Sequence, residues 1–234
     1  MTNTSALVLI DLQNEFLSPE GNFPIPDTEL LISNVTSLVS HFRAKGSTIF
    51  WVRACYAPYK PKASKGPRIP FDPLNGKHTG KTPCCIEGTP GADFPPAILA
   101  LIKSNEDIVF AKTWYSSFKE TDLEAALRKR GVTDVYIAGL MTNVCVLSTA
   151  AEAKRLGFEV RVVEECLGYA RKESHDKALR ALKDLGVGVI VASLAGSEAI
   201  PTENAPLRPT LYYVNGSIPS WRVMMALYEK VCRR

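Results

Sequence analysis

The sequence lacks the features of several protein classes. No apolar run in the 234 residues approaches the roughly 20 residues that a membrane-spanning helix needs. The N-terminal stretch MTNTSALVLIDLQNEF has neither the basic start nor the small-residue cleavage site of a secretory signal. The 28 basic and 24 acidic residues are spread along the chain, without the clustered basic stripe of a nucleic-acid-binding surface. We therefore expect a cytoplasmic protein that binds neither membranes nor nucleic acid.

Cofactor and metal motifs are also scarce. No GxGxxG or GxxxxGK[ST] segment is present, so no phosphate cradle supports a dinucleotide-binding oxidoreductase. The six cysteines follow no C-x2-C spacing and are expected to be mostly free thiols in a reducing compartment; they are Cys55, Cys84, Cys85, Cys145, Cys166 and Cys232. We expect no cofactor.

The chain does contain six short, almost continuously apolar runs that alternate with helical patterns. Strands are predicted at 6–10, 47–52, 107–111, 133–138, 158–163 and 187–192, and helices at 29–45, 120–130, 142–156 and 173–185. Runs of this kind are typical of strands buried on both faces of a parallel sheet. The alternation predicts an α/β fold: a Rossmann-like, doubly wound, mainly parallel six-stranded sheet with helices on both faces.

Two segments fall outside this alternation, although we interpret residues 1–234 as one domain. Residues 54–96 are rich in Pro, Gly and Lys and are too long for a simple connection, and loops of that length often cover or line a site. Residues 195–234 form a Pro-rich tail with a predicted helix at 220–231. The basic residues of the long loop are consistent with binding a substrate carboxylate or with a solvated loop.

Three chemically useful residues stand after predicted strands: Asp11 and Lys112 directly, and Cys145 across the turn at Gly139. Ligands of doubly wound sheets bind at the carboxyl ends of the strands, so we expect these side chains to converge there. An early position in a helix and a nearby ammonium would favour the thiolate of Cys145, and Asp11 would accept its proton. On the pattern alone, a core cysteine, a capping aspartate and a solvated lysine explain these residues equally well.

Three segments carry a family resemblance. VLIDLQNEF, KTWYSSF and GLMTNVCVLSTAAEA resemble the signature segments of the isochorismatase-like cysteine hydrolase superfamily, and EGTPGADF is similar to a loop common there. The resemblance covers most of residues 6–192 in the right order. It implies hydrolysis of a small amide, ureide or carbamoyl C–N bond through a thioester. Asp11 would then be the general base, Lys112 the cation that stabilises the thiolate, and Cys145 the nucleophile.

The resemblance also implies details around the nucleophile. A non-proline cis peptide is expected at Leu140–Met141, with the N–H groups of Met141 and Cys145 directed at the oxyanion. The expected substrate-binding residues, for which ordinary packing is the alternative, are Asn14, Phe16, Trp114 and Tyr115. Related proteins commonly form dimers or tetramers, so we expect a homo-oligomer acting on a small-molecule substrate.

The family has several branches. Nicotinamidases usually bind a metal through Asp-x-His and a further His, but here only His78 lies in the corresponding loop, so no metal is expected. His41 and His175 are interpreted as surface or capping residues. The presence of Cys145 favours amide hydrolysis, as in biuret, ureidoacrylate or N-carbamoylsarcosine hydrolases, over vinyl-ether cleavage by an isochorismatase. That ether hydrolase and a non-catalytic interaction protein remain the alternatives.

Two further cysteine features are weaker. Cys166 also follows a predicted strand and is a rival nucleophile, but no acid or cation from other strands is evident beside it. Cys84 and Cys85 are adjacent, which is consistent with a thiol switch or with two partly buried loop residues.

Overall fold

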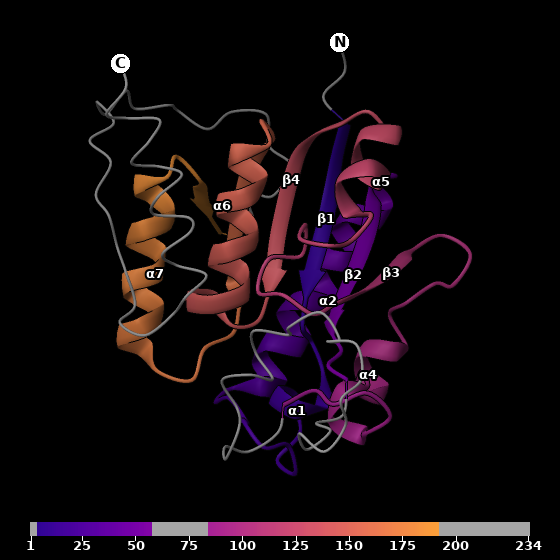
Figure 1. Cartoon of the computed structure of the whole chain (residues 1–234), viewed down its shortest axis with the longest axis vertical. Helices are drawn as coiled ribbons and strands as arrows, with labels where there is room; N and C mark the ends of the chain where they lie inside the picture. Colours follow the sequence, from indigo (N-terminus) through magenta and orange to yellow (C-terminus); the bar gives the residue numbers. More distant parts are fainter. Residues whose placement is uncertain (1–3, 58–83, 192–234) are drawn as a thin grey trace, which may run out of the picture. The chain divides into compact units, whose positions relative to one another are not determined.

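The computed structural model describes residues 4–57 and 84–191. Within them, six parallel strands form one sheet, of which Figure 1 labels β1 to β4. The strand order is β3-β2-β1-β4-β5-β6, and every neighbouring pair is parallel. The strands are β1 (Thr4–Ile10), β2 (Thr48–Ala54), β3 (Ile108–Lys112), β4 (Val132–Gly139), β5 (Glu159–Leu167) and β6 (Gly188–Ile190). This arrangement confirms the predicted doubly wound α/β fold, and the strand order reverses at β1.

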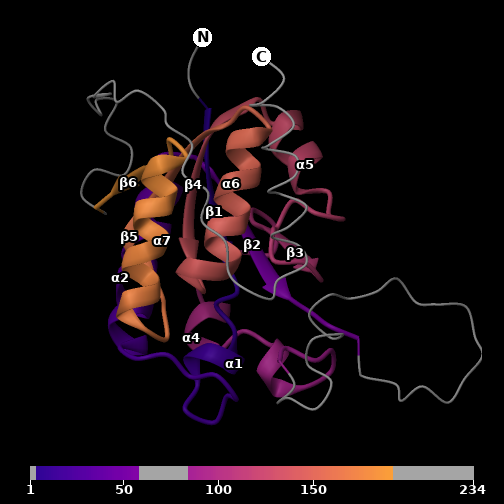
Figure 2. The same cartoon turned by 60° about the vertical axis from the view of Figure 1, so that its left-hand side comes forward.

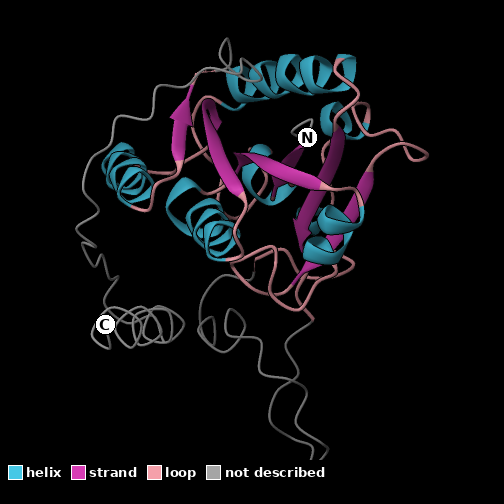
Figure 3. Ribbon diagram, turned by 90° about the horizontal axis from the view of Figure 1, so that it is seen from above, coloured by secondary structure: helices cyan, strands magenta, loops and turns pink. Residues whose placement is uncertain are grey.

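Helices cover both faces of this sheet (Figure 3). Helix α2 (Thr28–Ala44) packs on one face, and the other face is covered by α5 (Leu123–Lys129), α6 (Leu147–Arg155) and α7 (Lys172–Asp184). Helices α6 and α7 lie side by side (Figure 2). The shorter elements are α1 (Asn14–Leu17), α4 (Pro96–Leu99), the 3-10 turn η1 (Pro90–Ala92) and the π-helical turn η2 (Thr142–Val146). In the described ranges, no helix is long and apolar enough to span a membrane.

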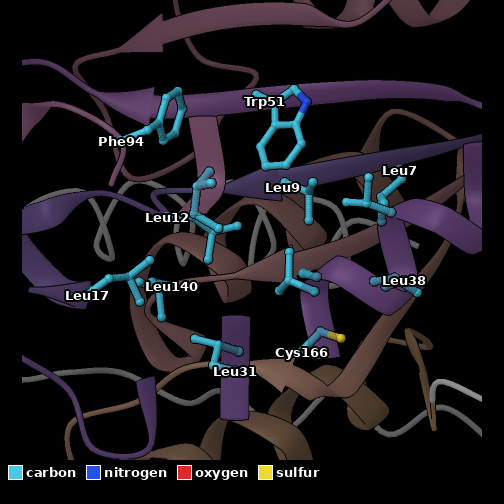
Figure 4. Close-up of a cluster of buried hydrophobic side chains, with 14 of the residues drawn as sticks. Leu7, Leu9, Leu12, Leu17, Leu31, Leu38, Trp51, Phe94, Leu140 and Cys166 are labelled. Carbon is cyan, nitrogen blue, oxygen red and sulfur yellow. The ribbon is translucent and has the colours of Figure 1, made fainter. Parts of the chain in front are cut away.

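The central strand β1 explains why the apolar runs are continuous. Leu7 and Leu9 point into the core under α2, where they meet Leu38 and Trp51 (Figure 4). Ala6, Val8 and Ile10 point into the core under α5, α6 and α7. All five residues of 6–10 are at most 1% exposed. A strand covered on both faces buries every side chain, so alternation with polar residues disappears.

The ends of β1 and β4 meet at a close backbone approach. Ile10 pairs with Gly139 in the register of the two strands. Gly139 has a φ of 115°, and a Cβ atom at this position would lie 2.1 Å from the carbonyl oxygen of Ile10. Glycine is therefore required here, and the chain turns directly from β4 toward the segment that carries Cys145.

The loop after β1 is fixed by the buried amide of Gln13. Its Nε2 donates to the carbonyl oxygens of Ala54 and Ala92, both at 2.8 Å. Its Oε1 accepts a 2.8 Å hydrogen bond from the backbone N–H of Ala54. The ends of β1 and β2 and the turn η1 are thereby joined at the carboxyl edge of the sheet.

Parts of the predicted organisation lie outside the described residues. These are the middle of the long loop, with the basic residues Lys60, Lys62, Lys65, Arg68, Lys77 and Lys81, and the tail with the helix expected at 220–231. The single domain over residues 1–234 stays a prediction.

Candidate active site

The three residues expected to carry the chemistry converge at the carboxyl edge of the sheet. Asp11 follows β1, Lys112 ends β3, and Cys145 lies in η2 after β4. Lys112 Nζ is 2.9 Å from Asp11 Oδ2 and 3.3 Å from Cys145 Sγ. Asp11, Lys112 and Cys145 are 2%, 1% and 8% exposed. An acid, a cation and a thiol from three strand ends thus form one buried cluster.

The ammonium of Lys112 is fully used by this cluster. It donates to Asp11, to Cys145 and, at 3.1 Å, to the carbonyl oxygen of Trp114. Three partners match the three N–H donors of a lysine. The side chain is therefore held between the other two residues and does not reach toward solvent.

One oxygen of Asp11 has no such partner. Oδ1 is buried and accepts no hydrogen bond from the residues that the structure describes. Its backbone has a φ of 54°, a left-handed conformation that is uncommon for residues other than glycine and concentrates at functional sites. A buried carboxylate oxygen without a donor is energetically costly, so its position suits a group that receives a proton during a reaction.

The charges in the cluster change the pKa values of Lys112 and Cys145. Burial acts to lower the pKa of Lys112, but the neighbouring charges of Asp11 and Cys145 outweigh it, and the pKa is raised. The pKa of Cys145 is also raised, because burial and the charge of Asp11 outweigh the opposing effect of Lys112. Lys112 acts on the pKa of Cys145 in the expected direction, but the raised pKa favours the protonated thiol at rest.

The segment before the nucleophile has an unusual backbone. The peptide bond between Leu140 and Met141 is cis. The following turn η2 is π-helical and leads into α6, so the helix predicted at 142–156 is divided in two. Cys145 lies in the first of these two parts, beside Lys112.

The expected substrate-binding residues differ in their surroundings. The side chain of Asn14 donates a 2.9 Å hydrogen bond to Pro90, and Phe16 is buried in the core under α2. Tyr115 is partly buried and packs against both cores. The ring of Trp114 makes a cation–π contact with the ammonium of Lys119, which lies 3.4 Å from the ring centroid. Contact of these residues with substrate stays a prediction.

Tyr56 follows β2 at the same edge of the sheet, and the sequence reasoning did not single it out. It is buried, and burial raises its pKa well above the ordinary value. The charges of Cys145 and Asp11 add to this effect. Its position just after a strand is the signal that was available, but the residue was assigned to the long loop as a whole.

The vicinal cysteines lie close to this region. Their sulfur atoms are 3.8 Å apart and both are free thiols. The backbone N–H of Cys85 donates to the buried carboxylate of Glu15 at 3.0 Å, and Glu15 also accepts from the N–H of Asn22 at 2.8 Å. Cys85 has a raised pKa, because its hydrogen bond with Cys84 favours the protonated thiol and burial adds to this effect. A redox role of the pair stays a prediction.

Three further residues considered in the sequence, Cys166, His41 and His175, differ in how deeply they are buried. Cys166 is a core residue under α2, and burial, with a contribution from Glu165, raises its pKa to about 12. His41 is exposed, as expected. The interpretation of His175 as a surface or capping residue is wrong, because packing of α7 buries it to 5% exposure and its Nδ1 lies 2.9 Å from Thr142 Oγ1.

The metal site of nicotinamidases has no fitting donor set in the described residues. Among them, no group of three or more His, Cys, Asp or Glu side chains is placed to hold a metal ion. His78 lies outside the described residues. We therefore derive no reaction step through a metal.

A family model named "Isochorismatase domain" matches residues 5–193 of the chain. The chain belongs to the isochorismatase family. A ureidoacrylate amidohydrolase, RutB, of Enterobacter sp. (strain 638) is 32% identical over 184 residues, which cover 74% of this chain and 79% of the relative. A probable inactive nicotinamidase of Arabidopsis thaliana is 27% identical over 184 residues, covering 78% of this chain and 90% of the relative.

Solved structures agree with the family assignment. The nicotinamidase/pyrazinamidase PncA from Bacillus subtilis aligns with a TM-score of 0.68 and 26% identity, covering 80% of this chain and 99% of its own. The predicted family and the predicted class, an isochorismatase-family hydrolase, are confirmed.

Proposed function

We propose that this isochorismatase-family protein hydrolyses a small amide, ureide or carbamoyl compound at a C–N bond, through a thioester on Cys145. The observation that carries the proposal is the position of Lys112 Nζ, which contacts both Asp11 Oδ2 and Cys145 Sγ inside a buried cluster. The names of the relatives, an amidohydrolase and a nicotinamidase, support a C–N bond as the target. Cytoplasmic location and a dimeric or tetrameric state remain predictions.

The first step is attack on the substrate carbonyl carbon. Because the resting thiol is protonated, Asp11 accepts the S–H proton as the sulfur attacks, and its unpartnered Oδ1 is available for this. Lys112 keeps its proton and its charge, since its pKa is raised, and stabilises the sulfur while negative charge develops on it. An S–C bond forms, and the carbonyl becomes an oxyanion.

The second step breaks the C–N bond. We propose that backbone N–H groups at Met141 and Cys145 bind the oxyanion while protonated Asp11 returns its proton to the departing nitrogen. Water then attacks the thioester with Asp11 as base, releasing the acid product and restoring the thiol. Tyr56 has a raised pKa and a neutral phenol hydroxyl, which is able to donate to the substrate.

The experiment is a measurement of ammonia or amine release from a panel of small compounds. The panel contains biuret, a ureidoacrylate, N-carbamoyl amino acids, nicotinamide and aliphatic amides, with the Cys145→Ala variant as blank. Release that requires Cys145, together with an acyl adduct on Cys145 in mass spectra of the quenched reaction, supports the proposal. Full activity of Cys145→Ala would exclude the thioester.

The same compounds and variants distinguish this proposal from two alternative functions. A vinyl-ether hydrolase would consume isochorismate with Asp11 as acid, and it would be inactivated by Asp11→Asn but not by Cys145→Ala. A non-catalytic role is the second alternative, and the probable inactive nicotinamidase among the relatives supports it. If no compound is turned over and all cysteines are alkylated slowly and uniformly, the non-catalytic role is favoured.

A further inference from the structure

The backbone that leads into the nucleophile turn is held from one side by Gly168. The N–H of Gly168 donates to the carbonyl oxygen of Gly139 at 3.0 Å. Its own carbonyl oxygen accepts from the backbone N–H of Thr142 at 3.0 Å and from Thr142 Oγ1 at 2.9 Å. A Cβ atom on Gly168 would lie 1.9 Å from Leu140 Cδ2, so the side chain before the cis bond packs directly on it.

The hydroxyl of Thr142 determines which nitrogen of His175 carries a proton. A carbonyl oxygen only accepts, so the single O–H of Thr142 must donate to Gly168. The second contact of this hydroxyl, at 2.9 Å, is with His175 Nδ1. Since the hydroxyl hydrogen is already used, Nδ1–H must be the donor in this contact. The buried pair therefore assigns the Nδ1–H tautomer to His175.

The surroundings of His175 favour its neutral form. Burial lowers the pKa of His175, and Lys172 acts in the same direction, whereas Asp176 and Glu164 act to raise it. The ring also lies against Tyr169, with the ring centroids 4.3 Å apart. A neutral imidazole with its proton on Nδ1 has a fixed orientation in this packing, and it holds Thr142 without placing a charge near the thiol.

Resting on the proposed function, we propose that His175 is a positioning residue for the nucleophile: its Nδ1–H fixes Thr142, and through it the turn η2 that sets Cys145 beside Lys112. Thr142 is the first residue of η2 and Cys145 is the fourth. Both ends of the link are buried, with Thr142 at 0% and His175 at 5% exposure. Loss of the link frees the start of this turn, and displacements of an ångström or less reduce rates substantially.

The test compares substitutions at residue 175 that differ in where they place a donor. His175→Phe keeps a planar ring without any donor, His175→Asn places an amide near Nδ1, and His175→Gln places it near Nε2. His175 and Gly168 line an open pocket of about 320 Å³. This pocket leaves room for the side chain of Asn or Gln at residue 175. Thr142→Val and Thr142→Ser provide the matched pair at the other end of the link.

We expect kcat to fall about tenfold or more in His175→Phe and in Thr142→Val, with KM changed less than threefold. His175→Asn and Thr142→Ser should recover most of kcat, whereas His175→Gln should not. The double variant His175→Phe/Thr142→Val should lose no more than Thr142→Val alone, because that substitution already removes the contact with His175. Alkylation of Cys145 by iodoacetamide at pH 8 should slow in parallel with kcat.

A purely structural role has a different signature. If His175→Phe lowers the melting temperature but keeps kcat and the alkylation rate of Cys145, the inference is wrong. Rescue by His175→Gln as complete as by His175→Asn would overturn the assignment of Nδ1. If His175→Phe does not fold, the Thr142 pair gives the same decision.

Failure of this inference is distinguishable from failure of the proposed function. Activity that persists in Cys145→Ala would refute the thioester, while alkylation of Cys145 still reports whether residues 142 and 175 position the thiol. Conversely, inactive Cys145→Ala together with wild-type kcat in Thr142→Val and His175→Phe would refute only the positioning role.

Discussion

Lys112 Nζ and Cys145 Sγ lie 3.3 Å apart, although 33 positions separate the two residues in the chain. The contact exists because β3 and β4 end at the same edge of a parallel sheet, on either side of β2 and β1. The same ammonium binds Asp11 at 2.9 Å, so one cation is shared by an acid and a thiol. The shared cation links the stability of the cluster to its reactivity.

Replacing Lys112 with Met should therefore damage both properties. The variant leaves Asp11 as a buried charge without its partner, which typically costs about 3–5 kcal/mol of stability. Because Lys112 acts to lower the pKa of Cys145, its loss should also slow alkylation of that thiol at pH 8. Chemical denaturation and iodoacetamide kinetics measure the two effects. Lys129→Met, at an exposed position of α5, is the control and should change neither.

Asp11→Asn should change reactivity and turnover in opposite directions. The charge of Asp11 raises the pKa of Cys145, so its removal should lower that pKa and speed alkylation at pH 8. Turnover should nevertheless fall by about 10²- to 10⁴-fold, because the general base is lost. Asp93→Asn, at an exposed position, is the matched control. Slower alkylation in Asp11→Asn would contradict the electrostatic assignment.

The sheet and the three clustered residues were predictable because their signals are local. The continuous apolar run of residues 6–10 reflects burial on both faces, and Asp11 follows that run directly. Lys112 ends β3, and Cys145 lies in the turn η2 that follows β4. In a parallel sheet, the carboxyl ends of the strands lie at one edge, so position after a strand indicates which residues can meet.

Other properties of the site depend on packing between distant elements and were not predictable. His175 has the helical spacing of a surface residue, but its contact with Thr142 arises only when α7 packs on η2. The pKa of Cys145 is raised because burial outweighs Lys112, and no sequence pattern reports burial of that degree. Tyr56 was hidden inside a segment that was interpreted as one long loop.

Gly139→Ala tests the close approach between β1 and β4. The substitution must accommodate both a φ of 115° and a Cβ atom 2.1 Å from the oxygen of Ile10. Gly131 is the matched control, because its φ is 64° but nothing lies within 4 Å of a Cβ atom there. We expect Gly131→Ala to cost about 1–2 kcal/mol for the left-handed backbone alone. Gly139→Ala should cost clearly more, about 3 kcal/mol or above, by urea denaturation. Equal costs would contradict the clash.

Alkaline pH should destabilise the protein through its buried thiols. The pKa values of Cys145, Cys85 and Cys166 are all raised in the folded chain, that of Cys166 to about 12. The unfolded chain loses these protons near the ordinary thiol pKa of about 8.5. A group with a raised folded pKa contributes its full stability below the unfolded value. That contribution is lost as pH rises toward the folded value.

Each buried thiol should therefore reduce the free energy of unfolding by about 1.4 kcal/mol per pH unit above pH 8.5. Cys166→Ala removes one such thiol without touching Asp11 or Lys112, so the slope of stability against pH should become shallower by that amount. Loss of a core atom also shifts the absolute stability, so only the slope is diagnostic. Urea denaturation from pH 8 to 10.5 measures it. A slope equal to that of the unsubstituted protein would mean that Cys166 ionises with nearly the same pKa in the folded and unfolded chains, against the burial that the core under α2 imposes on it.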